Sequence, residues 1–327
     1  MGGRVGILLK IFTFVCVLFG IALIVATWFF FMRPLTLDSW VSRFALGAAG
    51  LEQRSIEGPD GRLSWFEGGG GDTTLVLLHG EGEQAGNWAR VTMPLVERYR
   101  VVIPDLAGHG DSDPAEGPIG IDQVFAGLEA ILDESSDGQP VVLVGNSLGA
   151  RVAFLIALER PSQVERIVAL NGGPLRLEDP KVNVFPNNRE EARRTMEGLM
   201  GPSAKSIPDT VLDDIVRRAQ TSPAARLKAG ADGADAFFLD GQLHEVRTPV
   251  DLIWGLADQL YPVEYAKRLK GALPSARLTT LPDCGHVPQR ECPVIMVEAL
   301  LQVLEQGSPE RRVLPPTDRD LEIQETP

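Results

Sequence analysis

The stretch VVLVGNSLGARVAF, residues 141–154, decides which fold this sequence is expected to adopt. Its first half is a run of strand-forming apolar residues, and its second half has the apolar spacing of a helix. Between them, GNSLG places a glycine two positions before and two positions after Ser147, which suits a sharp reversal of the chain. Gly-x-Ser-x-Gly between a buried strand and a helix is typical of a nucleophile elbow, which exposes the serine hydroxyl above a sheet. The alternative is a tight turn with an inert serine.

Short apolar segments surround this motif and are mostly separated by segments with helical spacing. They are TLVLLHG (74–80), RVVIPDL (100–106), PVVLVGN (140–146), RIVALNG (166–172), PVDLIWG (249–255) and ARLTTLP (276–282). Strands that are buried on both faces form near-continuous apolar runs, and alternation with helices indicates a parallel sheet. The sequence therefore predicts a three-layer α/β domain, which we place at residues 54–306.

Three further segments define the edges and the interior of this domain. At its beginning, residues 54–66 show a two-residue alternation of side-chain character on either side of an Asp60-Gly61 turn. This pattern predicts a β-hairpin. Between about residues 174 and 245 the chain is polar and helical, with prolines between short helices. This insertion is too long for a simple crossover, so we expect a helical cap over the carboxyl edge of the sheet. Residues 307–327 are charged and rich in proline, which predicts a disordered tail.

An uncharged apolar run, IFTFVCVLFGIALIVATWFFFM (residues 11–32), precedes the domain. As a helix it is long enough to span the roughly 30 Å hydrocarbon core of a bilayer. We interpret residues 1–33 as a single-pass membrane anchor; a cleaved signal peptide, whose apolar region usually has about 7–15 residues, is the alternative. Residues 34–53 are expected to form a short juxtamembrane helix, or equally the first packed element of the domain.

The charges of the chain bear on its orientation and its partners. Two basic residues before the apolar run are matched by Arg33 and Arg43 after it, so the positive-inside rule does not orient the anchor. A short amino-terminal tail most simply stays in the cytoplasm, which places the large domain outside it. The chain has a net charge of −13, and the first 50 residues are basic, so the domain itself is strongly acidic. Such a domain should repel nucleic acid and anionic lipid head groups.

A serine hydroxyl needs a base within hydrogen-bond reach and an acid that orients this base. The sequence offers four histidines. In this type of fold the nucleophile precedes the acid and the base, which excludes His79 and His109 as the base. His244 lies in a polar connection, where a solvated surface histidine is the default interpretation. His286 follows the last strand, so we expect it to act as general base and then general acid toward Ser147.

The expected acid is Asp258, which follows the strand PVDLIWG in the segment LADQLYP. Ser147, Asp258 and His286 would then project from strand ends on the same edge of the sheet. Asp258 would fix the tautomer of the histidine and stabilise its imidazolium form. A helix cap ahead of Pro262 is the alternative role of Asp258, and Asp283 is a less well placed rival acid.

The oxyanion of a tetrahedral intermediate needs preorganised hydrogen-bond donors. HGEG, residues 79–82, ends the strand TLVLLHG, and its glycines let main-chain amides turn inward. We expect the donors to be the N–H groups of Glu81 and Leu148, the latter at the positive end of a helix. His79 and His109 are expected to hold loops by hydrogen bonds.

The cysteines and histidines do not suggest a metal site, because no pair among them has a recognised ligand spacing. We therefore expect neither a metal nor a cofactor. Cys16 lies in the apolar run, and Cys284 and Cys292 bracket His286. Three cysteines do not make a disulfide framework, so free thiols are expected, with a local disulfide only in an oxidising compartment.

These segments together resemble the α/β-hydrolase superfamily from about residue 54 to residue 306. The resemblance rests on LLHGEGEQAGNW, VVIPDLAGHGDS, LVGNSLGA, IWGLADQ and DCGHVPQRECP, in that order. It implies a mostly parallel sheet flanked by helices, carrying the serine, acid and base named above. Serine at the elbow distinguishes the chain from epoxide hydrolases and dehalogenases, which use aspartate there.

More narrowly, the chain looks like the membrane-anchored monoacylglycerol lipases and related bacterial lipases. It shares an amino-terminal span and cap segments of the type FPNNREEARRTMEGLM and IPDTVLDDIVRRA. This resemblance implies hydrolysis of carboxylic esters of lipids at a membrane, with a small lipid or ester as substrate. The cap residues expected to line the substrate entry, or else to form ordinary cap core, are Phe185, Met196, Phe237 and Phe238.

Glu81 departs from the pattern of these relatives, which commonly carry an apolar residue there beside the acyl pocket. A carboxylate that faces the pocket would disfavour a long acyl chain. Two other interpretations stay open. One is a carbon–carbon bond hydrolase of the same superfamily, whose relatives share the GNS elbow and the order of the three residues. The other is a non-catalytic binding protein on the same fold.

Overall fold

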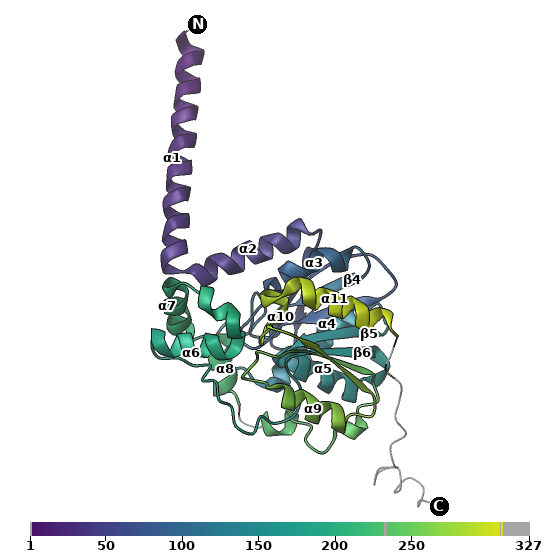
Figure 1. Ribbon diagram of the computed structural model, residues 1–327. Coiled ribbons are helices and arrows are strands. Elements are labelled where there is room, and N and C mark those ends of the chain that lie inside the picture. The colour runs from purple at the N-terminus through teal and green to yellow at the C-terminus, as the bar shows by residue number, and fades with distance from the viewer. Residues whose placement is uncertain (1, 232–233, 308, 310–327) are drawn as a thin grey trace, which may run out of the picture.

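An eight-stranded sheet organises the computed structural model, which describes residues 2–231, 234–307 and 309 (Figure 1). The strands are β1 (Glu52–Gly58), β2 (Gly61–Gly69), β3 (Thr74–Leu78), β4 (Arg100–Pro104), β5 (Val141–Asn146), β6 (Val164–Leu170), β7 (Val250–Gly255) and β8 (Ala276–Leu281). They lie in the order β1-β2-β4-β3-β5-β6-β7-β8. All the predicted strands are present, while most of the tail predicted at 307–327 lies outside the described residues.

The pairing of the strands is mostly parallel, as the sequence predicts. β1 and β2 form the expected antiparallel hairpin, whose register pairs Gly58 with Gly61 across the turn. β2 also runs antiparallel to β4, and every later pair from β4 to β8 is parallel. The carboxyl ends of β3 and β5 to β8 therefore meet at one edge of the sheet.

Helices cover both faces of the sheet, so the fold has three layers (Figure 1). α3 (Ala89–Val96) and α11 (Pro293–Glu305) pack on one face, and α4 (Ile121–Ser135), α5 (Leu148–Glu159) and α9 (Val263–Ala272) on the other. Side chains of β3 alternate between the two layers: Leu75 and Leu77 join the first core, and Val76 and Leu78 join the second. A strand with both faces buried reads as a continuous apolar run for this reason.

The cap lies between β6 and β7, where the sequence predicts it. It contains α6 (Arg189–Met200), α7 (Asp209–Arg218) and α8 (Pro223–Ala229), with 3-10 turns at Gly201–Ser206, Ala234–Phe237 and Leu243–Glu245. The side chain of Asn188 caps α6 by accepting the N–H of Glu191 at 2.9 Å. Pro223 starts α8, in the first turn, where a missing N–H costs nothing.

The amino-terminal helix α1 (Gly2–Met32) extends away from the rest of the protein (Figure 1). Its segment Lys10–Met32 is long and apolar enough to cross a membrane, and this segment is not buried against the rest of the chain. A signal sequence near the amino terminus would satisfy the same criteria of length and composition. α1 is therefore a candidate anchor.

Helix α2 (Pro34–Ala48) is packed against the domain. Leu46 is fully buried among residues of α3 and the sheet. The guanidinium of Arg43 lies 2.8 Å from the buried carboxylate of Asp105. At the other end, the N–H of Leu35 donates to the buried carboxylate of Asp214 in cap helix α7, at 3.0 Å. α2 thus joins the end of α1 to both the sheet layer and the cap.

Candidate active site

Ser147 lies at the sharp turn between β5 and α5, with a φ of 53° in the left-handed region. Such a conformation is strained for a residue with a side chain and occurs where the surrounding structure enforces it. Here the N–H of Ser147 donates to the carbonyl of Leu170 in β6, at 3.1 Å. A Cβ on Gly145 would lie 2.4 Å from the main chain of Gly149, so these glycines let strand and helix approach closely. The geometry is that of the predicted elbow.

His286 and Asp258 meet as predicted from their positions after β8 and β7. Nδ1 of His286 lies 2.8 Å from Oδ2 of Asp258, and both residues are buried. Oδ2 also accepts a hydrogen bond from Asn171, at 2.9 Å. Oδ1 accepts the main-chain N–H groups of Leu260 and Tyr261, at 2.8 and 3.0 Å. Asp258 therefore stabilises its own loop with one oxygen and orients the histidine with the other.

The pKa of His286 is raised above its ordinary value by the charges around it. Burial alone would disfavour the imidazolium and lower the pKa, but the charge of Asp258 and its hydrogen bond outweigh this effect. The carboxylates of Glu83 and Glu291 act in the same direction. An imidazole in this setting is a stronger base than one exposed to water.

Ser147 and His286 line one cavity of about 680 Å³, which lies between the sheet edge, the cap and α2. The apolar part of its wall comes from Leu35, Val184, Met196, Leu199, Ile215, Ala219, Ala224 and Leu260. The polar part includes Asp38, Ser39, Glu81, Glu83, Gln84 and Asn87. The ring of Tyr261 stacks on that of His286, with centroids 5.6 Å apart, and closes one side. The cavity is large enough for a small organic substrate beside the serine.

The turn at residues 80–83 passes directly beside the serine. A Cβ on Gly80 would lie 3.3 Å from the Cβ of Ser147. Within the described part of the chain, the N–H groups of Glu81 and Leu148 donate to no protein acceptor. These are the two donors predicted for an oxyanion, and main-chain donors without a protein partner are available to a ligand.

Two buried histidines hold this turn, which is the role predicted for them. His79 accepts the N–H of Leu106 at Nε2, at 3.0 Å, and its Nδ1 contacts the carbonyl of Gly80 at 2.8 Å. His109 accepts the N–H of Gly82 at 3.2 Å. Burial lowers the pKa of His79 to about 4 and that of His109 to about 3, so both are neutral acceptors near neutral pH.

Glu81, which departs from the pattern of the relatives, is one of the residues that line the cavity. Neighbouring protein atoms desolvate the carboxylate in part and so raise the pKa of Glu81, although the residue is exposed. The nearby positive charge of Arg151 opposes the shift.

The structure separates the four cap residues that the sequence grouped. Met196 of α6 lines the cavity. Among the described residues that form this wall, Phe185, Phe237 and Phe238 do not appear. Phe237 lines a different, smaller cavity. The ring centroid of Phe238 lies 4.4 Å from Cζ of Arg151 and 4.8 Å from Cζ of Arg176. Phe185 lies 4.5 Å from the ammonium of Lys228.

Residues of α2 were missed as part of the cavity wall. Leu35, Asp38 and Ser39 contribute to it although they precede the predicted domain. Their sequence carries no signal beyond the mixture of apolar and polar residues in this segment. Asn171, which contacts Asp258, could have been found, because it is a polar residue at the end of a buried strand on the same edge.

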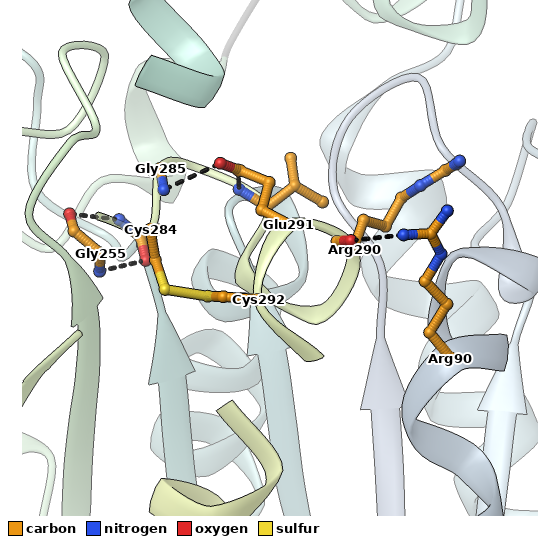
Figure 2. Close-up of a disulfide and its surroundings, with 9 residues drawn as sticks. Arg90, Gly255, Cys284, Gly285, Arg290, Glu291 and Cys292 are labelled. Carbon is orange, nitrogen blue, oxygen red and sulfur yellow. Dashed lines mark hydrogen bonds between the residues drawn. A yellow bond between two sulfur atoms is a disulfide. The ribbon is translucent and has the colours of Figure 1, made fainter. Parts of the chain in front are cut away.

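Cys284 and Cys292 form a disulfide, so the expectation of free thiols at these positions is wrong (Figure 2). The chain reverses between β8 and α11, which brings the two Cα atoms to 6.0 Å, within the usual range for a disulfide. Sequence spacing alone does not reveal such a reversal. Cys16 is a free, exposed cysteine in α1.

Comparisons with known proteins identify a family and several similar proteins. A family model described as the alpha/beta hydrolase family matches residues 75–299. A pimeloyl-[acyl-carrier protein] methyl ester esterase of Aromatoleum aromaticum is 33% identical over an alignment of 251 residues, which covers 69% of this chain and 97% of that protein. A 2-hydroxy-6-oxononadienedioate/2-hydroxy-6-oxononatrienedioate hydrolase of Cupriavidus pinatubonensis is 29% identical over 249 residues, 70% of this chain and 86% of that one.

Among solved structures, a bacterial membrane phospholipase A is similar over 91% of this chain and 98% of its own, with a TM-score of 0.70 and 25% identity. A lipase described as putative, from Acinetobacter baumannii, is 21% identical, covers 82% of this chain and 96% of its own, and has a TM-score of 0.70. At 21% identity, the likeness to the Acinetobacter baumannii structure shows a shared fold and no more.

The family model covers most of the chain. Its match begins in β3 and includes the strands from β4 to β8, the elbow and the cap. We conclude that this chain belongs to the alpha/beta hydrolase family.

Proposed function

We propose that the protein is a membrane-tethered serine hydrolase that cleaves carboxylic esters of amphipathic lipids, of the monoacylglycerol type, through an acyl-enzyme. One observation carries the proposal: His286 is hydrogen-bonded to Asp258 at 2.8 Å and lines the same cavity as Ser147. Nucleophile, base and acid roles go to Ser147, His286 and Asp258 in that order. The Glu81 and Leu148 N–H groups are assigned to the oxyanion.

The reaction follows from these assignments. Oγ of Ser147 attacks the ester carbonyl while His286 takes the hydroxyl proton, and the charge that develops on the carbonyl oxygen is met by the two N–H groups. His286 then gives the proton to the leaving alkoxide, which departs as an alcohol and leaves an acyl-serine. Water, deprotonated by the same histidine, attacks this ester, releases the carboxylic acid and restores the serine.

The lipid character of the substrate is supported by the surroundings of the cavity. Part of its wall comes from α2, which begins two residues after the end of α1, and part from cap helix α7. If α1 is inserted in a bilayer, α2 and α7, which both contribute to the cavity wall, lie next to the end of the span (Figure 1). The wall has apolar and polar parts, which suits a molecule with an acyl chain and a polar alcohol. The solved membrane phospholipase A, similar over 91% of this chain, also supports the proposal.

The test uses the full chain, purified in detergent. The wild type is expected to react with a fluorophosphonate probe and to hydrolyse monoacylglycerols, while Ser147→Ala does neither. Hydrolysis restricted to 2-hydroxy-6-oxononadienedioate would instead support the carbon–carbon bond hydrolase, the activity named for one relative. Absence of both labelling and hydrolysis would favour a binding protein on the same fold.

Glu81 is expected to set the preferred length of the acyl chain. Glu81→Met replaces a carboxylate in the cavity by an apolar side chain of similar length, so a long chain no longer meets a charge that must be desolvated. We expect the ratio of kcat/KM for dodecanoyl over butanoyl esters to rise on the order of tenfold, which corresponds to about 1.4 kcal/mol. Glu81→Gln, which stays polar, is the matched control. An unchanged ratio in Glu81→Met would show that this side chain does not contact the acyl group.

The disulfide supports a location of the hydrolase domain outside the cytoplasm. Disulfides form and persist in oxidising compartments, whereas cytoplasmic thiols are usually kept reduced. Alkaline phosphatase fused after residue 307 is expected to be active in cells, because it folds only on the oxidising side. A fluorescent protein fused at the same point, which needs the cytoplasm, is expected to stay dark. The opposite pair of results would place the domain inside.

A further inference from the structure

The loop that carries His286 is closed by two contacts that the reaction scheme does not use. The disulfide joins Cys284, two residues before the histidine, to Cys292 (Figure 2). Glu291, the residue before Cys292, turns its carboxylate back into the loop and reaches Gly285, the residue after Cys284. We call the Cys284–Cys292 disulfide and the Glu291 carboxylate together the histidine clamp.

The carboxylate of Glu291 binds the main chain on both sides of His286. Oε2 accepts the N–H of Gly285 at 2.9 Å, and Oε1 accepts the N–H of Val287 at 2.7 Å. Hydrogen bonds from amides to a carboxylate are stronger than those between neutral groups. The Val287 N–H belongs to the peptide unit that directly follows the Cα of His286, and the Gly285 N–H belongs to the Cys284–Gly285 unit. The carboxylate therefore holds the main chain on both sides of the histidine and restricts the direction in which its side chain leaves the main chain.

The main chain of His286 itself is tied to the elbow and to the cap. Its carbonyl accepts a hydrogen bond from Nδ2 of Asn146, the residue before Ser147, at 2.8 Å. Its N–H donates to the carbonyl of Leu199 in α6, at 2.7 Å. Gln289, in the short helix α10 (Pro288–Glu291) that follows, donates to Oδ1 of Asn146 at 3.1 Å. A loop placed by Glu291 therefore holds His286 at a defined distance from the serine.

The disulfide limits the distance between the Glu291 carboxylate and the N–H of Gly285. Its two half-cystines are the chain neighbours of Gly285 and Glu291, so the covalent bond keeps the two ends of the Glu291–Gly285 hydrogen bond together (Figure 2). There is little room for adjustment, because a Cβ on Gly285 would lie 2.2 Å from the carbonyl of Leu199. Opening the disulfide would let the loop ends separate and the carboxylate lose its two amides.

We propose that Glu291 is a positioning residue for His286, and that it acts only while the Cys284–Cys292 disulfide is closed. This inference rests on the proposed function, since it needs His286 to be the base. It makes turnover depend on the oxidation state of one disulfide outside the substrate cavity. The carboxylates of Glu81, Glu83, Asp258 and Glu291 act electrostatically on His286, so removing the charge of Glu291 should also be visible in the pH profile.

The first arm of the test replaces Glu291 in the full chain. Glu291→Gln keeps the size of the side chain but turns an amide N–H₂ toward one of the two N–H groups and removes the charge. We expect kcat to fall about 10- to 100-fold, as for a misplacement of a reacting group by about 1 Å, while KM changes by less than about twofold. The acidic limb of the kcat/KM profile should move to lower pH. Glu298→Gln, an exposed glutamate of α11, makes the same charge change away from the loop and should leave kcat and the profile unchanged.

The second arm tests the disulfide, first by reducing the wild type. Dithiothreitol supplies two electrons to the disulfide, yields two thiols and is itself oxidised to its cyclic disulfide. The reduced wild type is expected to lose activity and fluorophosphonate labelling rate about tenfold or more, to keep its circular dichroism, and to recover on reoxidation. Cys16→Ala should respond like the wild type. A Cys284→Ser/Cys292→Ser variant should be slow from the start and insensitive to the reagent.

The outcomes separate this inference from the proposed function. If the wild type hydrolyses esters but Glu291→Gln and reduction leave kcat unchanged, the clamp is wrong and the function stands. If Glu291→Gln lowers only thermal stability, with an unmoved acidic limb, Glu291 is structural and the positioning role is wrong. If Glu291→Gln fails to fold, the response of the wild type to reduction decides alone. A wild type that neither labels nor hydrolyses esters overturns the function and the clamp with it.

Discussion

Ser147→Ala is expected to lower kcat for ester hydrolysis by a factor on the order of 10⁵–10⁶. The substitution removes the only oxygen that can attack from the elbow, and loss of the nucleophile of a triad typically costs about that much. Stability should change little, because the side chain is small and only partly buried. Initial rates with a water-soluble short-chain ester, measured over a wide range of enzyme concentration, give the ratio.

The matched control is Ser162→Ala, at an exposed serine in the short turn Pro161–Gln163 after α5. It should keep wild-type kcat and wild-type labelling by the fluorophosphonate. Ester hydrolysis by Ser147→Ala at more than about a hundredth of the wild-type rate would mean that the acyl group is transferred to water without this serine.

Asp258→Asn is expected to lower kcat by a factor of about 10⁴. The N–H₂ group of an asparagine can donate to Nδ1 of His286. This favours the tautomer with the proton on Nε2, which cannot take the proton of the serine. The substitution should also move the acidic limb of kcat/KM. His286 must be neutral to act as a base, so activity falls as pH drops through its pKa, which lies above the ordinary value near 6.5. Removing the charge of Asp258 lowers that pKa, and the limb should move to lower pH.

The rival acid provides the control. Asp283→Asn changes an exposed carboxylate in the same region, and it should leave both kcat and the acidic limb within about twofold of the wild type. A larger effect at Asp283 than at Asp258 would reverse the assignment. A wild-type pH profile in Asp258→Asn would show that the hydrogen bond at 2.8 Å does not govern the base.

The triad candidates were predictable because each follows a strand that can be recognised in the sequence. Parallel strands end at one edge, so Ser147 after β5, Asp258 after β7 and His286 after β8 converge there whatever the length of the segments between them. Apolar runs bounded by glycine and polar residues are local signals, and the order of nucleophile, acid and base follows from the topology. The hairpin, the parallel sheet and the cap were predictable for the same reason.

The walls of the cavity were not predictable in this way. Apolar cap residues of similar type reach different surroundings: Met196 lines the cavity, whereas the ring of Phe238 lies beside the guanidinium groups of Arg151 and Arg176. The contribution of α2 depends on Asp214, a cap residue far along the chain whose buried carboxylate holds the N–H of Leu35. No local pattern relates these two positions.

By itself the sequence determined the α/β fold, the elbow and the three candidate side chains at one sheet edge. Each of these depends on short-range periodicity and on the order of strands, which the chain carries along its length. Only the tertiary structure decided the disulfide, the two amides held by Glu291 and the packing of α2 against the cap. These contacts depend on how loops reverse and how separate layers meet, and that geometry is set by the packing of the whole molecule rather than by any one segment.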